Sequence, residues 1–88
     1  MNQYDIFIKN SAKKDLEKIK TSHLKENFEE IIKTLKENPF EETQSFEKLY
    51  PKSAELYSRR INQQHRVVYR VDEAARRVVI YSAWTHYK

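Results

Sequence analysis

Residues 58 to 71 read Ser58-Arg-Arg-Ile-Asn-Gln-Gln-His-Arg-Val-Val-Tyr-Arg-Val71, and the architecture of the chain can be inferred from them. Two runs rich in β-branched and aromatic residues flank a polar connection, which is typical of two antiparallel strands. We predict strands over residues 56–61 and 65–71. A polar turn over residues 72–75 then leads into a strand over residues 76–85. The sequence therefore predicts three consecutive antiparallel strands.

The length of the first connection decides which side chains share a face, because side chains alternate along a strand and directly opposed residues lie on the same face. A loop of three residues, 62–64, places Arg60 opposite Arg66. An even-numbered loop would place Arg60 among apolar side chains, where an unpaired guanidinium is costly. We therefore expect one charged face and one apolar face that packs on the helices. The charged face holds Ser58, Arg60, Arg66, Val68 and Arg70, and the apolar face holds Tyr57, Ile61, Val67, Tyr69 and Val71.

The first half of the chain predicts a strand followed by two helices. The strand is indicated by the alternation of Tyr4, Ile6 and Ile8 with Asp5, Phe7 and Lys9. Apolar residues then recur at helical spacing in two stripes, and Asn38-Pro39 ends the second. The stripes are Ala12, Leu16 and Ile19, and then Leu24, Phe28, Ile31, Ile32 and Leu35. Residues 39–54 are expected to form an extended loop that carries Glu47.

Length and composition favour a single small domain, residues 1–88, of the α+β class: an N-terminal strand, two helices, and antiparallel strands forming one twisted sheet. With 39% hydrophobic and 12% aromatic residues, a small core is possible. The absence of cysteine excludes disulfides and thiolate metal sites and suits a reducing compartment, so we expect a cytoplasmic protein. We also expect no metal and no cofactor. No segment approaches the roughly 20 apolar residues of a membrane helix, and no signal-peptide pattern opens the chain.

Charge is distributed unevenly along the chain. Residues 1–50 hold nine lysines against ten acidic residues, whereas residues 51–88 hold eight basic residues against three acidic ones. All six arginines lie between Arg59 and Arg77. Guanidinium groups bind phosphate in a planar, bidentate geometry, so this pattern favours a polyanionic partner. The alternative interpretation is an ordinary solvated charged face.

Five short motifs occur in order between about residue 39 and residue 87. They are Pro39-Phe-Glu, the stretch Glu47–Leu49, Ser58-Arg-Arg-Ile, His65-Arg-x-Val-Tyr69 and His86-Tyr87. In these motifs the chain resembles the YoeB-like branch of the RelE toxins, which are ribosome-dependent mRNA interferases of bacterial toxin–antitoxin pairs. The resemblance implies a compact fold with an antiparallel sheet, a cognate YefM-like antitoxin, and cleavage of mRNA in the ribosomal A site.

The resemblance also implies roles for individual residues. Cleaving RNA without a metal requires a base for the ribose 2′-OH, a cation for the phosphorane charge, and an acid for the departing 5′-oxygen. The matching positions make Glu47 the general base, Arg66 the charge stabiliser and His86 the general acid. Tyr87 is expected to hold or stack on a nucleotide base. Phosphate binding is expected from the remaining basic and aromatic positions, Arg59, Arg60, Arg70 and Tyr50.

The sequence departs from the family pattern at several positions. Tyr50 stands where we expect a lysine that helps hold the scissile phosphate, and Gln64 precedes His65 where a glutamate is usual. The last turn is about two residues longer, and Lys88 extends beyond the usual terminal tyrosine. We expect the chain to remain a competent catalyst, and the effect of these differences on catalytic efficiency stays open. His65 is expected to pack in the hairpin rather than to orient Arg66.

Two other functions remain open. A toxin of this fold that blocks its target by binding alone would not need Glu47, Arg66 and His86 together. A second alternative is a basic module that represses transcription together with an antitoxin, and it predicts that this chain alone binds operator DNA. We expect operator contact only through the complex with the antitoxin. The expected partners are therefore the antitoxin, ribosomal RNA and mRNA, with no membrane partner.

Overall fold

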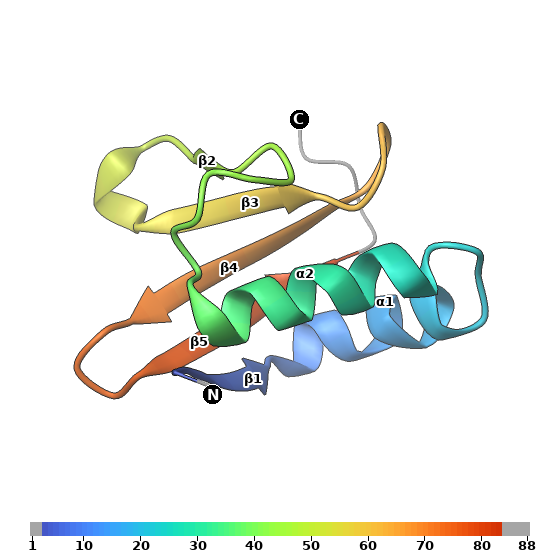
Figure 1. The fold of residues 1–88 in the computed structure, drawn as a ribbon, viewed down its shortest axis with the longest axis horizontal. Helices are drawn as coiled ribbons and strands as arrows, with labels where there is room; N and C mark the ends of the chain where they lie inside the picture. Colours follow the sequence, from blue (N-terminus) through green and yellow to red (C-terminus); the bar gives the residue numbers. More distant parts are fainter. Residues whose placement is uncertain (1–2, 84–88) are drawn as a thin grey trace.

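The computed structural model describes residues 3–83, in which two helices lie beside a five-stranded sheet (Figure 1). The elements are β1 (Asp5–Ile8), α1 (Asn10–Lys20), α2 (Lys25–Glu37), β2 (Glu47–Lys48), a 3₁₀ turn (Lys52–Ala54), β3 (Leu56–Arg60), β4 (Arg66–Asp72) and β5 (Arg77–Ser82). The strand order is β1-β5-β4-β3-β2. Strand β1 runs parallel to β5, and all other neighbours are antiparallel. The predicted α+β fold, with an N-terminal strand and two helices before the sheet, is confirmed.

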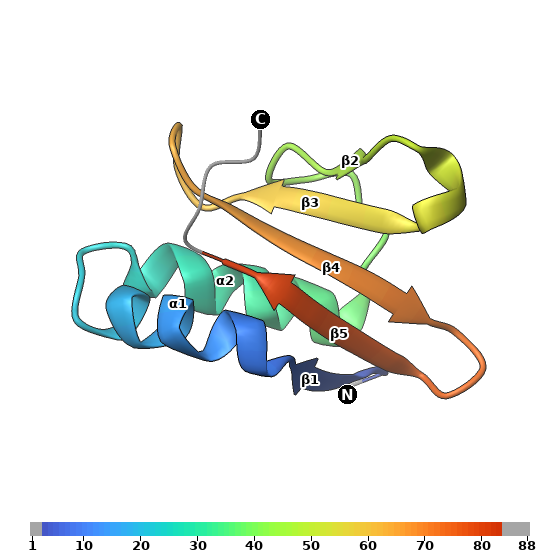
Figure 2. The ribbon, with the colours of Figure 1, turned by 180° about the vertical axis from the view of Figure 1, so that it is seen from behind.

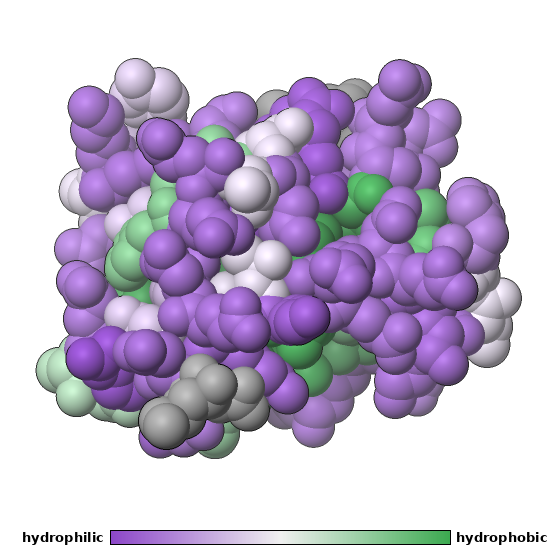
Figure 3. Space-filling model, viewed as in Figure 1, coloured by the Kyte–Doolittle hydropathy of each residue, from purple (hydrophilic) through white to green (hydrophobic). Residues whose placement is uncertain are grey.

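Both helices cover the same face of the sheet, as the two opposite views show (Figures 1 and 2). Figure 2 looks onto the other face of the sheet, with β5 crossing in front of α2; we call this face the open face. The apolar stripes of the helices explain this layering, because each buries its stripe against the sheet. The helical side of the surface is mostly hydrophilic, with apolar residues visible in small patches (Figure 3).

One hydrophobic cluster fills the space between helices and sheet. Its buried members are Tyr4, Ala12, Leu16, Ile19, Leu24, Ile31, Leu35, Ile61, Val67, Tyr69, Val78, Ile80 and Ala83. Tyr57 and Val71 pack against it, so every residue predicted for the apolar face of the hairpin lies there. Neither helix of the described residues 3–83 is long and apolar enough to cross a membrane.

The β3–β4 hairpin has the register that the alternation of residues predicts. Arg60 lies opposite Arg66, and the N–H of Ile61 donates to the carbonyl of His65 at 2.8 Å. The side-chain carbonyl of Asn62 accepts hydrogen bonds from the N–H groups of Gln64 and His65, both at 2.8 Å. This Asx-type capping closes the three-residue loop without a glycine. The odd-numbered loop is therefore confirmed.

The segment between α2 and β3 differs from the prediction. Residues 39–54 are not a simple extended loop, because Glu47 and Lys48 form β2 and pair with Ser58 and Tyr57 of β3. Two residues are too few to produce a recognisable alternation, and their extended geometry depends on the hydrogen-bonding edge of β3. Glu47 therefore lies on the edge strand of the sheet rather than on a loop.

Candidate nucleic-acid-cleaving face

Three of the predicted site residues share the open face of the sheet. Glu47 lies opposite Ser58 on β3, and Arg60, two residues further along β3, lies opposite Arg66 on β4. Since opposed residues and residues two positions apart point to the same side of a sheet, these three side chains share one face. Diagonal neighbours such as Glu47 and Arg60 have Cβ atoms about 7–8 Å apart, within reach of long side chains.

Arg60 and Arg66 concentrate positive charge at one point of this face. Like charges that lie directly opposite each other destabilise a sheet. Within residues 3–83 no carboxylate forms an ion pair with either guanidinium, and Arg60 Nη1 donates only to the carbonyl of Gln63, at 3.2 Å. Arg60 is exposed and Arg66 half-buried. A phosphate group bound here would relieve the repulsion and accept charge-assisted hydrogen bonds from both side chains.

Glu47 is exposed beside this pair of arginines and is held by its neighbours in the chain. Phe46 stacks on Tyr57 with ring centroids 5.5 Å apart, and Leu49 is buried. The N–H of Leu49 donates to the carbonyl of Leu56 at 2.8 Å and so extends the pairing of β2 with β3. The carboxylate thus projects from a short edge strand that is anchored on both sides.

Arg70 lies on the same face but in a different environment. It is four residues from Arg66 along β4, a separation of about 13 Å. Its Nη2 lies 3.3 Å from Oε2 of Glu55, and hydrogen bonding to Tyr81 and to Glu55 raises the pKa of its guanidinium. Arg70 is exposed, and a phosphate would compete with the Glu55 carboxylate for its guanidinium. Phosphate binding by Arg70 stays a prediction.

The prediction that Arg59 binds phosphate is wrong. Its side chain is 0% exposed. Residue 59 is two positions from both Tyr57 and Ile61, so it shares with them the face that packs on the helices. Its guanidinium donates to backbone carbonyls and to the Tyr69 hydroxyl. A donor group that is fully used inside the protein cannot contact a phosphate. The alternation of side chains along residues 57–61 identifies Arg59 as facing the helices, on the same side as Tyr57 and Ile61.

The described structure does not test the roles of three further predicted site residues. Tyr50 is 79% exposed two positions after β2, and its contact with phosphate stays a prediction. His86 and Tyr87 lie outside the described residues, so their proposed roles are untested. His65 is half-buried in the hairpin, and its backbone N–H is one of the two that donate to the side chain of Asn62.

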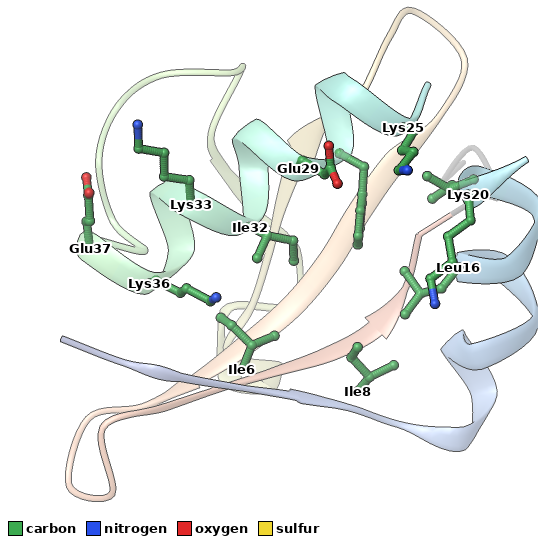
Figure 4. Close-up of a pocket in the computed structure, with 12 residues that line it drawn as sticks. Ile6, Ile8, Leu16, Lys20, Lys25, Glu29, Ile32, Lys33, Lys36 and Glu37 are labelled. Carbon is green, nitrogen blue, oxygen red and sulfur yellow. The ribbon is translucent and has the colours of Figure 1, made fainter. Parts of the chain in front are cut away.

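A large hollow, of about 790 Å³, lies elsewhere, between β1, α1 and α2 (Figure 4). Its apolar lining consists of Ile6, Ile8, Leu16, Ile19, Phe28 and Ile32, with lysines and glutamates at the margin. It is on the helical side of the sheet and holds none of the predicted site residues. Within residues 3–83 there is also no cluster of three or more His, Cys, Asp or Glu side chains that could hold a metal ion.

Solved structures similar to this chain are toxins. A YoeB/ParE toxin from Agrobacterium tumefaciens has a TM-score of 0.84 and 28% identity over 94% of this chain and 99% of its own. The YoeB dimer from Staphylococcus aureus has a TM-score of 0.82 and 30% identity over 97% and 99%. The toxin in the YoeB-YefM complex of the same organism has a TM-score of 0.79 and 30% identity over 96% and 98%.

Comparison at the level of sequence gives a consistent result. A search of curated proteins found no significant match. The sequence profile of the YoeB-like toxins, in contrast, matches residues 6–87, nearly the whole chain. This match and the relatives of 30% identity agree with the resemblance seen in the short motifs. The chain therefore belongs to the family of YoeB-like toxins of bacterial type II toxin–antitoxin systems.

Proposed function

We propose that this toxin, acting as a single domain, is a ribosome-dependent mRNA interferase that cleaves mRNA in the A site. The observation that carries the proposal is the position of Glu47 on the open face beside the Arg60–Arg66 pair. A carboxylate next to two guanidinium groups supplies two of the three groups that RNA cleavage without a metal requires. His86 is proposed as the third.

The proposed chemistry assigns one step to each of these groups. Glu47 removes the proton of the ribose 2′-OH, and the oxygen attacks the adjacent phosphorus to form a pentacoordinate phosphorane. Arg66, with Arg60 beside it, stabilises the added negative charge. The bond from phosphorus to the 5′-oxygen then breaks, His86 protonates that oxygen, and a 2′,3′-cyclic phosphate remains. Tyr87 is proposed to hold or stack on the neighbouring base.

Primer extension on a translated message tests this proposal. Programmed ribosomes are incubated with the wild-type toxin and with the variants Glu47→Gln, Arg66→Ala and His86→Gln. We expect cleavage by the wild type and a large loss in each variant. Cleavage that is unchanged in the Arg66 and His86 variants would refute the assignment of roles. A toxin that stops translation without cutting the message would instead support action by binding alone.

We also propose that an antitoxin covers the open face. The Staphylococcus aureus relative is solved as a YoeB-YefM complex. A flexible acidic segment could order itself across Arg60 and Arg66, because both guanidinium groups lack a carboxylate partner within residues 3–83. Co-purification of the two proteins from their operon, followed by elution with salt, tests this. We expect operator DNA to bind the complex and not the toxin alone.

A further inference from the structure

Arg59 makes a set of hydrogen bonds that is unusual for a buried cation. Its Nη2 donates to the carbonyls of Pro39 (2.9 Å) and Glu41 (2.7 Å), and its Nη1 donates to the carbonyl of Thr43 (2.9 Å). Its Nε donates to the hydroxyl of Tyr69 at 3.0 Å. All three carbonyls belong to the segment of residues 39–46 that connects α2 to β2. Within residues 3–83 no carboxylate pairs with Arg59, so the protein binds this cation through backbone dipoles.

Tyr69 completes the contact with the start of the segment. Its hydroxyl accepts the hydrogen bond from Arg59 and donates its own proton to the carbonyl of Pro39 at 2.7 Å. Pro39 is fully buried, and its carbonyl accepts hydrogen bonds from both Arg59 and Tyr69. Burial raises the pKa of the Tyr69 hydroxyl to about 12, although Arg59 opposes this effect, so the donor stays protonated at physiological pH.

Arg59 also contacts the end of the segment. The ring of Phe46, the residue directly before Glu47, lies 4.8 Å from the guanidinium carbon, within the range of a cation–π contact. The same ring stacks on Tyr57. One side chain thus holds the connection near its beginning, in its middle and at its last residue before β2.

The segment needs this restraint because its backbone is strained. Gln44 and Ser45 both have φ of 55°, a conformation that is unfavourable for residues other than glycine, and this chain contains no glycine. The N–H of Arg60 donates to the carbonyl of Gln44 at 2.8 Å, and β2 itself has only two residues. So short a strand cannot by itself hold Glu47 in one position, because it contributes few hydrogen bonds.

We propose that Arg59 is a positioning residue for Glu47: from the packed side of the sheet it holds the strained segment that presents the carboxylate beside Arg66 on the open face. This inference rests on the proposed role of Glu47 as the general base. It accounts for the presence of a guanidinium rather than an aliphatic side chain, since only a planar group with five N–H donors can bind Tyr69 and three carbonyls together. A lysine has three donors and cannot reproduce this pattern.

A double-mutant cycle tests the proposal with single-turnover cleavage on programmed ribosomes. Arg59→Lys is introduced into the wild type and into Glu47→Gln. In the wild-type background we expect Arg59→Lys to lower the rate of cleavage about tenfold or more, because a small displacement of a catalytic group is enough for such a loss. The KM for the ribosome should be nearly unchanged. In the Glu47→Gln background the further loss should stay within about twofold, since residues that act as one unit are not additive.

Equal losses in both backgrounds would overturn the positioning role, because general destabilisation does not depend on Glu47. An unchanged rate in Glu47→Gln alone would instead refute the proposed function, so the two failures are distinguishable. Tyr69→Phe removes one hydroxyl and serves if Arg59→Lys does not fold; it should show the same dependence on Glu47. Arg77→Lys, an exposed position on β5 outside this network, is the matched control and should leave cleavage unchanged.

Discussion

Arg59 and Arg60 are neighbours on β3 and carry the same functional group, yet they lie on opposite faces of the sheet. Arg59 is fully buried and donates to four oxygen atoms of the protein at 3.0 Å or less, whereas Arg60 is exposed and donates to one carbonyl at 3.2 Å. The packed face uses a guanidinium to order the backbone. The open face leaves guanidinium groups available for an external anion. The same side chain therefore acts structurally or in binding according to its place in the alternation of the strand.

The largest expected effect concerns the open face. Arg66→Ala should lower the rate of mRNA cleavage about 10²–10³-fold, the usual loss when a donor to a developing charge is removed. Its stability should change little, because the side chain makes no ion pair within residues 3–83. Cleavage assays and thermal unfolding of the same preparation measure both quantities. A variant that unfolds readily would contradict the division of roles between the two faces.

The packed face should show the opposite behaviour. Arg59→Met should lower the free energy of unfolding by about 3 kcal/mol, since the carbonyls of Glu41 and Thr43 lose the donor that Arg59 supplies. The matched control is Arg60→Met, for which we expect a change within about 0.5 kcal/mol, as for other exposed positions. Urea unfolding monitored by fluorescence compares the two. Equal effects of the two substitutions would remove the contrast between these neighbours.

Tyr69→Phe tests the hydrogen bonds of the packed face through the pH dependence of stability. Losing the hydroxyl should cost about 1–2 kcal/mol at pH 8, because the Pro39 carbonyl and Arg59 each lose a partner. Burial raises the pKa of Tyr69 to about 12, whereas an unfolded tyrosine titrates near pH 10. The stability that this group contributes is therefore fully present below pH 10 and is lost as the pH rises toward 12.

The measurement for this prediction is the difference in unfolding free energy between the wild type and Tyr69→Phe. The advantage of the wild type should shrink between about pH 10 and pH 12, because the unfolded wild-type chain can ionise its tyrosine first. The lysines titrate in both proteins and cancel in the difference. An advantage that is constant with pH would contradict the buried, neutral state of this hydroxyl.

Arg60→Gln should have an effect comparable in size to that of Tyr69→Phe, but on binding rather than on stability. One phosphate contact fewer should weaken binding to ribosome-bound mRNA roughly tenfold and should reduce the slope of log affinity against log salt by about 0.7. Filter binding at several salt concentrations measures both. An unaltered slope would indicate that Arg60 is only a solvated charge. Arg77→Gln, on β5, provides the comparison for a general loss of one positive charge.

Much of the fold could be predicted because its determinants are local. The helical stripes depend on residues three or four apart. The β3–β4 register follows from the odd number of loop residues, because an even-numbered loop would place Arg60 among apolar side chains. Two predictions failed. The pairing of Glu47 and Lys48 with β3 could not be predicted, because the partner strand is distant in sequence. The local alternation of residues 57–61 places Arg59 on the apolar face, whereas its partners are carbonyls 16 to 20 residues away.

Periodicity and short motifs were enough to predict the N-terminal strand, both helices, the three C-terminal strands, the family, and the common face of Arg60 and Arg66. The assembled fold was needed to show that β1 pairs in parallel with β5, that Glu47 lies on an edge strand beside those arginines, and that Arg59 binds backbone carbonyls. The physical reason is that each of these features depends on hydrogen-bond partners that become neighbours only when the sheet is assembled.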